Sequence, residues 1–167
     1  MFKKIVLFAL LLVPMGAMAQ DASKIAYFNS GEIITIMPEY LQMQDSLKRE
    51  QAAIEDMLRV YEEEYGKKYT ALMAEGDTLV ESIKVRRLQD IRDIEERAAS
   101  FNQDSQQRLQ QLQQNLFIPI QQKVRTAIEE VGTENGFAYI LDAASLLFIN
   151  PSSTDATPLV KAKLGLK

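Results

Sequence analysis

Apolar residues recur at alternating spacings of three and four in two long stretches of the chain, a pattern typical of helices with one apolar seam. The first stretch covers residues 38–73, in which Gly66 is the only glycine. Its seam consists of Leu47, Gln51, Ile54, Leu58, Tyr61, Tyr65 and Leu72, with Lys68 as the polar exception. The pattern predicts one helix that begins at Pro38, because a proline costs no hydrogen bond at the first helical position.

The second periodic stretch covers residues 78–131 and contains two overlapping seams. One runs through Ile91, Ile94, Ala98, Phe101, Ser105, Arg108 and Leu112, and the other through Leu109, Leu112, Leu116, Ile120, Val124, Ile128 and Val131. We therefore expect one long helix whose apolar seam changes register near Arg108. Pro119 lies inside this helix, where it removes one backbone hydrogen bond and should kink the axis.

The segment between the two stretches predicts a tight helical hairpin. Gly76 can adopt the left-handed conformation that ends a helix, and Thr78 with Glu81 has the spacing of a capping box that starts the next one. In a hairpin folded about Gly76, residues equally distant from that glycine face each other. Acidic residues then lie close to basic ones, namely Glu62, Glu63 and Glu64 close to Arg86, Arg87 and Arg92. One continuous helix through Gly76 is the alternative.

Short elements flank the hairpin at both ends of the chain. Residues 24–28 are an apolar run that predicts a strand, and Asn29 with Glu32 has the spacing that caps a brief helix behind it. At the other end, Asn135 and Gly136 should stop the second long helix, because glycine accepts the left-handed conformation there. These elements bring both ends of the chain to the base of the hairpin.

The last part of the chain predicts further short elements. Residues 137–142 and 146–150 are two apolar runs that predict strands joined by a three-residue turn. Residues 151–156 are polar, so we expect them to be irregular. A last helix is expected from Thr157 to near Gly165, because a proline follows Thr157 at the first helical turn.

Together these elements define a mainly α-helical fold with a small β-containing body. Residues 38–119 form a long antiparallel helical hairpin, a coiled-coil arm with its tip near residues 75–78, and residues 20–37 and 120–167 form the body. Such a small body would leave open strand edges, which favours association with further copies of the chain. The residues expected to build this oligomerisation body are Ile25, Tyr27, Phe137, Tyr139, Ile140, Leu141, Leu147, Phe148 and Ile149.

The first residues have the layout of a secretory signal peptide. Lys3 and Lys4 precede the nine apolar residues 5–13, and small residues lead to a cleavage site after Ala19. A helix of nine residues spans about 14 Å, too short for a bilayer core of about 30 Å. We expect residues 1–19 to be removed on export. This leaves no integral membrane segment and changes the net charge from −4 to −6, because both lysines leave.

The composition argues against catalysis and against a metal or cofactor. The chain has no cysteine, no histidine and only 7 glycines, none of them in a phosphate-binding motif. An acid hydrolase that uses Glu62 and Glu63 as paired carboxylates is a further hypothesis, but consecutive helical residues point in different directions. The negative net charge also disfavours nucleic acid as a partner. We expect a binding protein without catalytic residues.

Three segments resemble one known family. Residues 25–29, 127–142 and 155–161 are similar to the first strand, to the end of the long helix with its following strand, and to the closing helix of the Skp/OmpH family of periplasmic chaperones. The resemblance implies a periplasmic homotrimer whose helical arms enclose a cavity. It also implies that unfolded outer-membrane proteins are held there without ATP. A structural coiled-coil protein of the envelope, or an adaptor for one fixed partner, is the alternative.

Apolar and aromatic side chains of the arm are the candidate contacts for an unfolded client, because methionine is flexible and tyrosine is amphipathic. They are Tyr61, Tyr65, Tyr69, Leu72, Met73, Leu79 and Val80. The alternative is that Tyr61, Tyr65 and Leu72 form only the seam between the two helices. Gly66 and Pro119 are the candidate hinges of the arm, because each weakens a helix.

Overall fold

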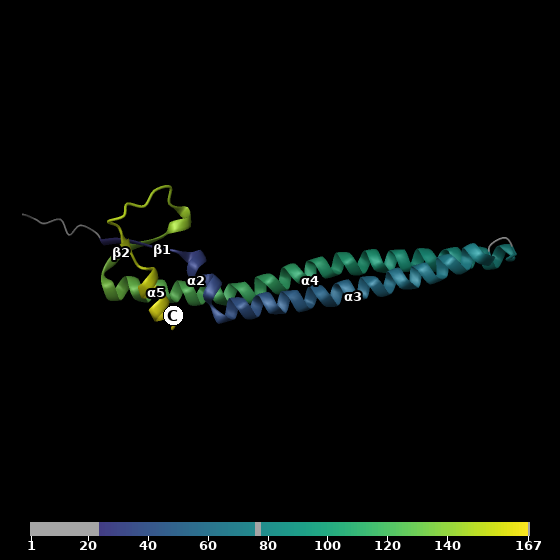
Figure 1. Ribbon diagram of the computed structural model, residues 1–167, viewed down its shortest axis with the longest axis horizontal. Helices are drawn as coiled ribbons and strands as arrows, with labels where there is room; N and C mark the ends of the chain where they lie inside the picture. The colour runs from purple at the N-terminus through teal and green to yellow at the C-terminus, as the bar shows by residue number, and fades with distance from the viewer. Residues whose placement is uncertain (1–23, 76–77, 167) are drawn as a thin grey trace, which may run out of the picture.

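The two long helices form an antiparallel hairpin that projects from a small body (Figure 1). The computed structural model describes residues 24–75 and 78–166; the expected signal peptide lies outside them. Helix α3 (Pro38–Glu75) has 38 residues, which corresponds to about 57 Å at 1.5 Å per residue. Helix α4 (Glu81–Asn135) has 55 residues and continues past the start of α3 into the body. The hairpin is therefore confirmed, and the continuous helix is excluded.

The tip of the hairpin differs from the predicted one. The backbone N–H and the hydroxyl of Thr78 both donate to the carbonyl oxygen of Glu75, at 2.9 and 2.8 Å. Thr78 therefore closes the turn after α3 and does not cap α4, whose N-cap is Val80 without a side-chain hydrogen bond. The predicted capping box of Thr78 and Glu81 is wrong, and α4 begins only at Glu81. The helix end predicted at Gly76 lies outside the described residues.

This longer turn shifts the pairing between the two helices. Ion pairs join Lys68 to Asp90 and Glu75 to Arg87, so the sequence midpoints of these pairs are residues 79 and 81. The hairpin is therefore centred near residue 80, and the predicted pairing about Gly76 is wrong. The reason is that α4 begins only at Glu81, so the connection between the helices is longer than a turn centred on Gly76.

Buried side chains follow the predicted seams of the arm. Ser105 is buried and Arg108 is exposed, whereas Leu109 and Leu112 beyond it are half-buried, so the seam changes register where the sequence predicts it. Helix α4 continues through Pro119; the kink at this residue stays a prediction. The fully buried seam residues in the arm are Ile54, Leu72, Ile91, Ile94 and Ser105.

The body contains a three-stranded parallel sheet in the order β2-β1-β3. Strand β1 (Lys24–Phe28) lies in the middle, β2 (Phe137–Asp142) follows α4, and β3 (Thr154–Asp155) pairs with the other edge of β1. The strands predicted at residues 24–28 and 137–142 are confirmed.

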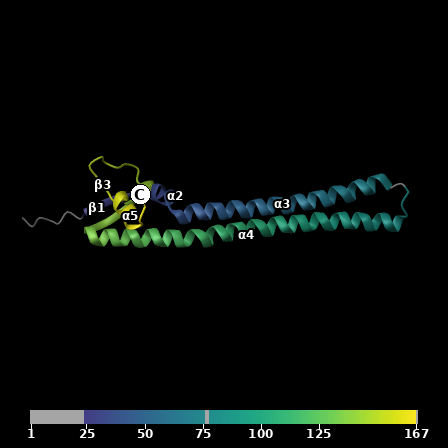
Figure 2. The same cartoon turned by 60° about the horizontal axis from the view of Figure 1, so that its bottom comes forward.

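The segment between β2 and β3 has a different secondary structure from the one that the sequence predicts. Residues 146–150 form no strand, whereas β3 comes from the stretch predicted to be irregular. Asp142 Oδ1 accepts a hydrogen bond from the N–H of Ala144 at 3.1 Å and starts the 3-10 helix η1 (Ala143–Ser145), so the chain does not turn back beside β2. It crosses to the free edge of β1 instead. Both ribbon views show this segment as a loop that projects from the body (Figures 1 and 2).

Caps fix the short helices of the body. Asn29 Oδ1 accepts a hydrogen bond from the N–H of Glu32 at 3.0 Å and caps α2 (Ser30–Ile36), as predicted. Gly136, at φ 65°, ends α4, also as predicted. The last helix, α5 (Thr157–Lys163), starts where the sequence predicts and stops just before Gly165.

The hydrophobic core of the body lies between one face of the sheet, the base of α4 and the short helices. Ala26 and Phe28 face this core from β1, because alternate residues of a strand point to the same side. Lys163 Nζ lies 2.6 Å from Glu134 Oε1 and 3.0 Å from Glu130 Oε2, and these two carboxylates raise the pKa of Lys163 and fasten α5 to α4. The buried core residues are Ala26, Phe28, Ile33, Met37, Met43, Ile120, Val124, Ala127, Val131, Ala156 and Val160.

Candidate functional site

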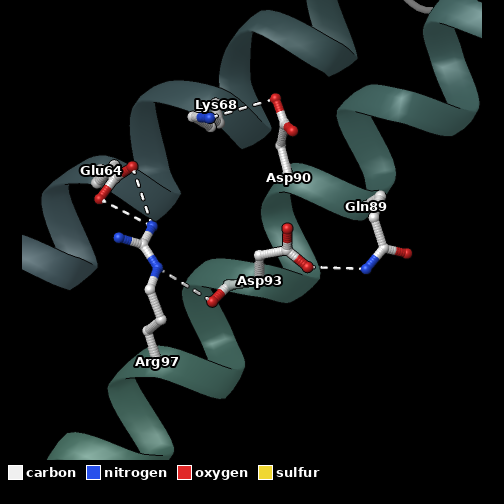
Figure 3. A network of polar contacts seen from close by, with 6 residues as sticks. All are labelled: Glu64, Lys68, Gln89, Asp90, Asp93 and Arg97. Atoms are coloured by element: carbon white, nitrogen blue, oxygen red, sulfur yellow. Dashed lines mark hydrogen bonds and ion pairs between the residues drawn. The ribbon is translucent and has the colours of Figure 1, made fainter.

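One side of the hairpin, which we call the ion-pair face, carries the charged contacts between α3 and α4. Among the described residues, α3 contributes positions 39, 50, 64, 68 and 75 to these pairs. These positions recur on the same side of a helix with 3.6 residues per turn. Figure 3 shows Arg97 reaching from α4 to Glu64, at 3.3 Å, and Lys68 reaching from α3 to Asp90, also at 3.3 Å.

The partner of Glu64 corrects the predicted pairing. Glu64 contacts Arg97 rather than the predicted partners, Arg86, Arg87 and Arg92, because the hairpin is centred near residue 80. The general expectation of complementary helices holds, since carboxylates of α3 face guanidinium groups of α4 at Glu50, Glu64 and Glu75. Each of these exposed pairs stabilises the hairpin by about 0.2–1 kcal/mol.

The pair nearest the body favours the ionised form of its carboxylate. Lys123 on α4 donates to Glu39 in the first turn of α3. This hydrogen bond, together with a backbone hydrogen bond, lowers the pKa of Glu39. Pro119, one of the two hinge candidates, lies beside this pair in a shallow hollow at the base of the arm.

The other side of the hairpin carries a hollow of about 440 Å³, which we call the arm groove. The hollow forms because Ala98 and Ala99 of α4 are too short to fill the space beside Tyr61 and Tyr65 of α3. Glu62 lies on the opposite side of the α3 seam from Glu64, because two helical residues at this spacing are about 200° apart. The residues that line the arm groove are Leu58, Tyr61, Glu62, Tyr65, Ile94, Glu95, Ala98, Ala99 and Asn102.

The structure divides the candidate client contacts into seam residues and surface residues. Leu72 is only 2% exposed and belongs to the seam. Tyr61 is half-buried, because its ring contacts Phe101 of α4 with 5.8 Å between the ring centroids. Tyr65 stacks on Tyr69 at 5.8 Å with an interplanar angle of 9°, so these two rings form one small aromatic surface.

The remaining candidates lie closer to the tip. Tyr69, Met73 and Val80 are 44%, 61% and 66% exposed, so they can meet a second molecule without any rearrangement of the hairpin. Leu79 is half-buried in the turn that follows α3. Gly66, the other hinge candidate, lies inside α3 with open space around the position of a side chain.

Several exposed apolar residues of the arm were missed by sequence reasoning. Their signal was an apolar side chain outside the three-four spacing of the seam, which places it on the surface of a two-helix arm. Such residues add to the apolar surface that the arm presents to solvent. They are Leu41, Met57, Val60, Ile83, Val85, Leu88 and Ile118.

A second apolar surface, which we call the open sheet face, lies on the body. Ile25 pairs with Tyr139 and Tyr27 with Leu141 across β1 and β2, so these side chains stand on the face turned away from the core. Ile25, Tyr139 and Leu141 are 53%, 62% and 41% exposed. Phe137, the first residue of β2, is half-buried.

The loop after η1 extends the open sheet face. Leu147 is fully exposed and Phe148 is 78% exposed, although both are large and apolar. Phe148 and Ile149 line a hollow against the open sheet face. The predicted body residues are therefore of two kinds, since Phe137 and Ile140 pack instead against the core of their own chain.

The described residues show no arrangement typical of a metal centre. Residues 24–75 and 78–166 contain no group of three or more acidic side chains placed to hold a metal ion. The hypothesis of a paired-carboxylate site at Glu62 and Glu63 gains no support, because Glu62 lines the arm groove and Glu63 does not. Over the same residues, no helix combines the length and the apolar character that a bilayer crossing requires.

Comparisons with known proteins agree with the predicted fold class and family. The family model described as outer membrane protein (OmpH-like) matches residues 24–164, and the chain therefore belongs to the OmpH-like family. Its fold is similar to a crystal structure from Caulobacter crescentus CB15 of a protein assigned as an outer membrane chaperone (OmpH-like). The TM-score is 0.75 at 18% sequence identity, over 84% of this chain and 82% of that chain. No curated protein matches the sequence.

Proposed function

We propose that this protein is a chaperone that holds unfolded outer-membrane proteins without ATP and without a catalytic step. Membership of the OmpH-like family and the similar OmpH-like structure support this role. The observation that carries the proposal is the exposed apolar surface of the arm, which includes Tyr69, Met73 and Val80. An unfolded chain exposes apolar side chains that can bury themselves against such a surface.

The thin arm suits weak and reversible binding. Two helices cannot enclose a core of their own, so each exposed side chain offers a client only part of the burial that a folded interior would provide. Flexible methionine and amphipathic tyrosine accept many partner shapes. A client bound by many weak contacts can therefore leave again as its own folding buries the same side chains, without a nucleotide-driven step.

We further propose that three copies assemble through their bodies and surround a cavity with their arms. The open sheet face and the loop carrying Leu147 and Phe148 form an apolar surface on a body that is otherwise well packed. Burial of this surface between copies would also cover the outer edges of β2 and β3. Several arms around one space multiply contacts that are weak individually.

We propose that this activity lies in the periplasm, and the expected signal peptide supports this location. Unfolded outer-membrane proteins cross that compartment before they insert, and a holding protein there has no ATP to use. Periplasmic location is tested by fractionating cells that produce the full-length chain and determining the N-terminus of the exported protein. The N-terminus should be Gln20.

The function is tested by aggregation assays with the mature protein. Two unrelated outer-membrane barrel proteins are diluted from urea, and light scattering is followed with and without the proposed chaperone. We expect scattering of both clients to fall. The variant Tyr69→Ser/Met73→Ser should suppress aggregation less well, whereas the matched control Glu63→Ser/Lys67→Ser, which changes polar residues of the same helix, should behave like the wild type.

Two results would contradict the proposal. Unchanged scattering of both clients would mean that the arm does not hold unfolded chains. Capture of one folded envelope protein, together with no effect on unfolded clients, would instead support the alternative of an adaptor with a fixed partner.

A further inference from the structure

The arm groove is apolar inside and acidic at its rim. Leu58 of α3 and Ile94 of α4 form apolar parts of its lining. The lining also includes one carboxylate from each helix, Glu62 of α3 and Glu95 of α4. Both carboxylates belong to exposed residues. No lysine or arginine is among the residues that line the groove. An entering molecule therefore meets two negative charges beside an apolar hollow.

The negative charge is unevenly distributed around the hairpin. On the ion-pair face, Arg97 and Arg87 neutralise Glu64 and Glu75. Among the described residues, neither Glu62 nor Glu95 takes part in an ion pair. The two carboxylates at the arm groove therefore keep their negative charge without a partner in the described part of the hairpin, and they can attract a cation.

The walls of the groove suit a particular kind of side chain. Its volume of about 440 Å³ lies within the usual range of small-ligand pockets, which is ample for one aromatic or branched aliphatic side chain. Tyr61 and Tyr65 belong to its lining. Tyrosine rings pack well against other aromatic groups, and the face of such a ring attracts a cation. Arg97 already lies 5.8 Å from the Tyr61 ring centroid on the ion-pair face.

We infer that the arm groove binds a segment of an unfolded client in which an aromatic or aliphatic residue is flanked by lysine or arginine. The apolar residue enters the hollow, and the cations on either side contact Glu62 and Glu95. This inference rests on the proposed chaperone function and adds the sequence class that the arm selects. Since the two carboxylates come from different helices, a segment lying across the hairpin can reach both at once.

The test uses three labelled peptides that differ only beside a central phenylalanine, which is flanked by two lysines, two glutamines or two glutamates. Binding to the full mature protein is followed by fluorescence anisotropy at low salt. Two exposed charge contacts predict that the lysine peptide binds about two- to thirtyfold more tightly than the glutamine peptide. The glutamate peptide should bind most weakly. The differences should shrink at high salt, because exposed charges are screened.

Matched variants locate the effect in the groove. Glu62→Gln/Glu95→Gln should remove the preference for lysine, whereas Glu63→Gln/Glu96→Gln changes the net charge equally and should keep it. Ala99→Leu partly fills the groove and should weaken all three peptides, while Ala52→Leu, at an exposed position of α3 away from the groove, should not. Circular dichroism checks that every variant is folded.

Each outcome decides the inference. Equal affinities for the three peptides, binding to none of them, or a preference that survives Glu62→Gln/Glu95→Gln would overturn it. Burial of the groove by a second copy of the arm, seen as protection of Ala99 from exchange in the absence of peptide, would overturn it as well. The aggregation assay is independent of these measurements, so suppression of client aggregation by the same protein would leave the proposed function standing.

Discussion

Phe148→Asp should dissociate the proposed assembly while leaving each chain folded. Phe148 lies in the loop between η1 and β3 and is 78% exposed, so its side chain contributes little to the core of its own chain. Ile140 provides the contrast, because it packs against the buried residues of the body. Ile140→Asp should therefore unfold the body, even though both residues were expected from the sequence to build the oligomerisation body.

The size of the effect follows from the surface that assembly would bury. Full burial of a phenylalanine side chain is worth about 1.5–3 kcal/mol, and 78% of the Phe148 residue surface is available. Three copies together would lose about 4–7 kcal/mol per trimer, which is a factor of about 10³–10⁵ in the dissociation constant. Three introduced carboxylates would weaken the assembly further.

The assay is sedimentation equilibrium over a range of micromolar concentrations, with circular dichroism on the same samples. The wild type should sediment as a trimer, and Phe148→Asp should shift to the monomer with an unchanged helical spectrum. Val85→Asp is the control, because it places the same charge at an apolar position of α4 that is 55% exposed on the arm. It should stay trimeric.

A trimeric Phe148→Asp protein at low micromolar concentration would refute the assignment of this loop to the interface. A monomeric wild type with a stable helical spectrum would refute assembly through the body altogether. If Ile140→Asp were folded and monomeric while Phe148→Asp were trimeric, the core side of the body and its interface side would have been assigned the wrong way round.

Three further predictions concern the arm. Ile94→Ala should lower the free energy of unfolding by about 2–4 kcal/mol in urea titrations, because Ile94 is 1% exposed in the seam. Gly66→Ala should slow amide hydrogen exchange over residues 61–92 and reduce capture of large clients more than small ones. The reason is that glycine destabilises a helix by about 1 kcal/mol relative to alanine, and no atom obstructs the added methyl group. The pKa of Glu39 is lower in the folded state than in the unfolded state. Its contribution to stability is therefore present above the unfolded pKa and is lost as the pH falls through the folded pKa. Lys123→Gln should remove this contribution, so a plot of the urea midpoint against pH should become flatter on its acid side.

The long helices could be predicted because the three-four spacing of apolar residues is repeated many times along each of them. Ile54, Leu72, Ile91 and Ile94 all lie on a seam that the spacing alone defines. Even the change of register near Arg108 is visible in the sequence, because two overlapping seams compete there. The pairing of the helices depended instead on one turn, in which the hydroxyl of Thr78 bonds back to α3. The spacing of the seams does not show where this turn ends, and the start of α4 at Glu81 decides the centre of the hairpin.

The body was harder to predict because its elements are short and depend on one another. Strand β3 has two polar residues and no periodicity, and it exists because the free edge of β1 accepts it. The apolar run at residues 146–150 has a stronger strand signal, yet Asp142 diverts the chain before it can pair. Of the candidate site residues, the sequence could name Tyr69 and Met73 but could not show that the small side chains of Ala98 and Ala99 open a groove.

Helix α4 connects the arm directly to the core of the body, so a change at its base moves the whole arm. One unbroken helix carries the groove residues Ile94 and Ala98 and, nearer its end, the core residues Val124 and Val131. Helix α3, by contrast, begins only at Pro38, after the extended backbone of Met37, and contributes Met43 of its first turns to the same core. A tilt of α4 by about 5° at its base displaces the end of an arm of about 57 Å by about 5 Å. In the proposed trimer, small changes in how the body packs would therefore become larger changes in the width of the space between arms.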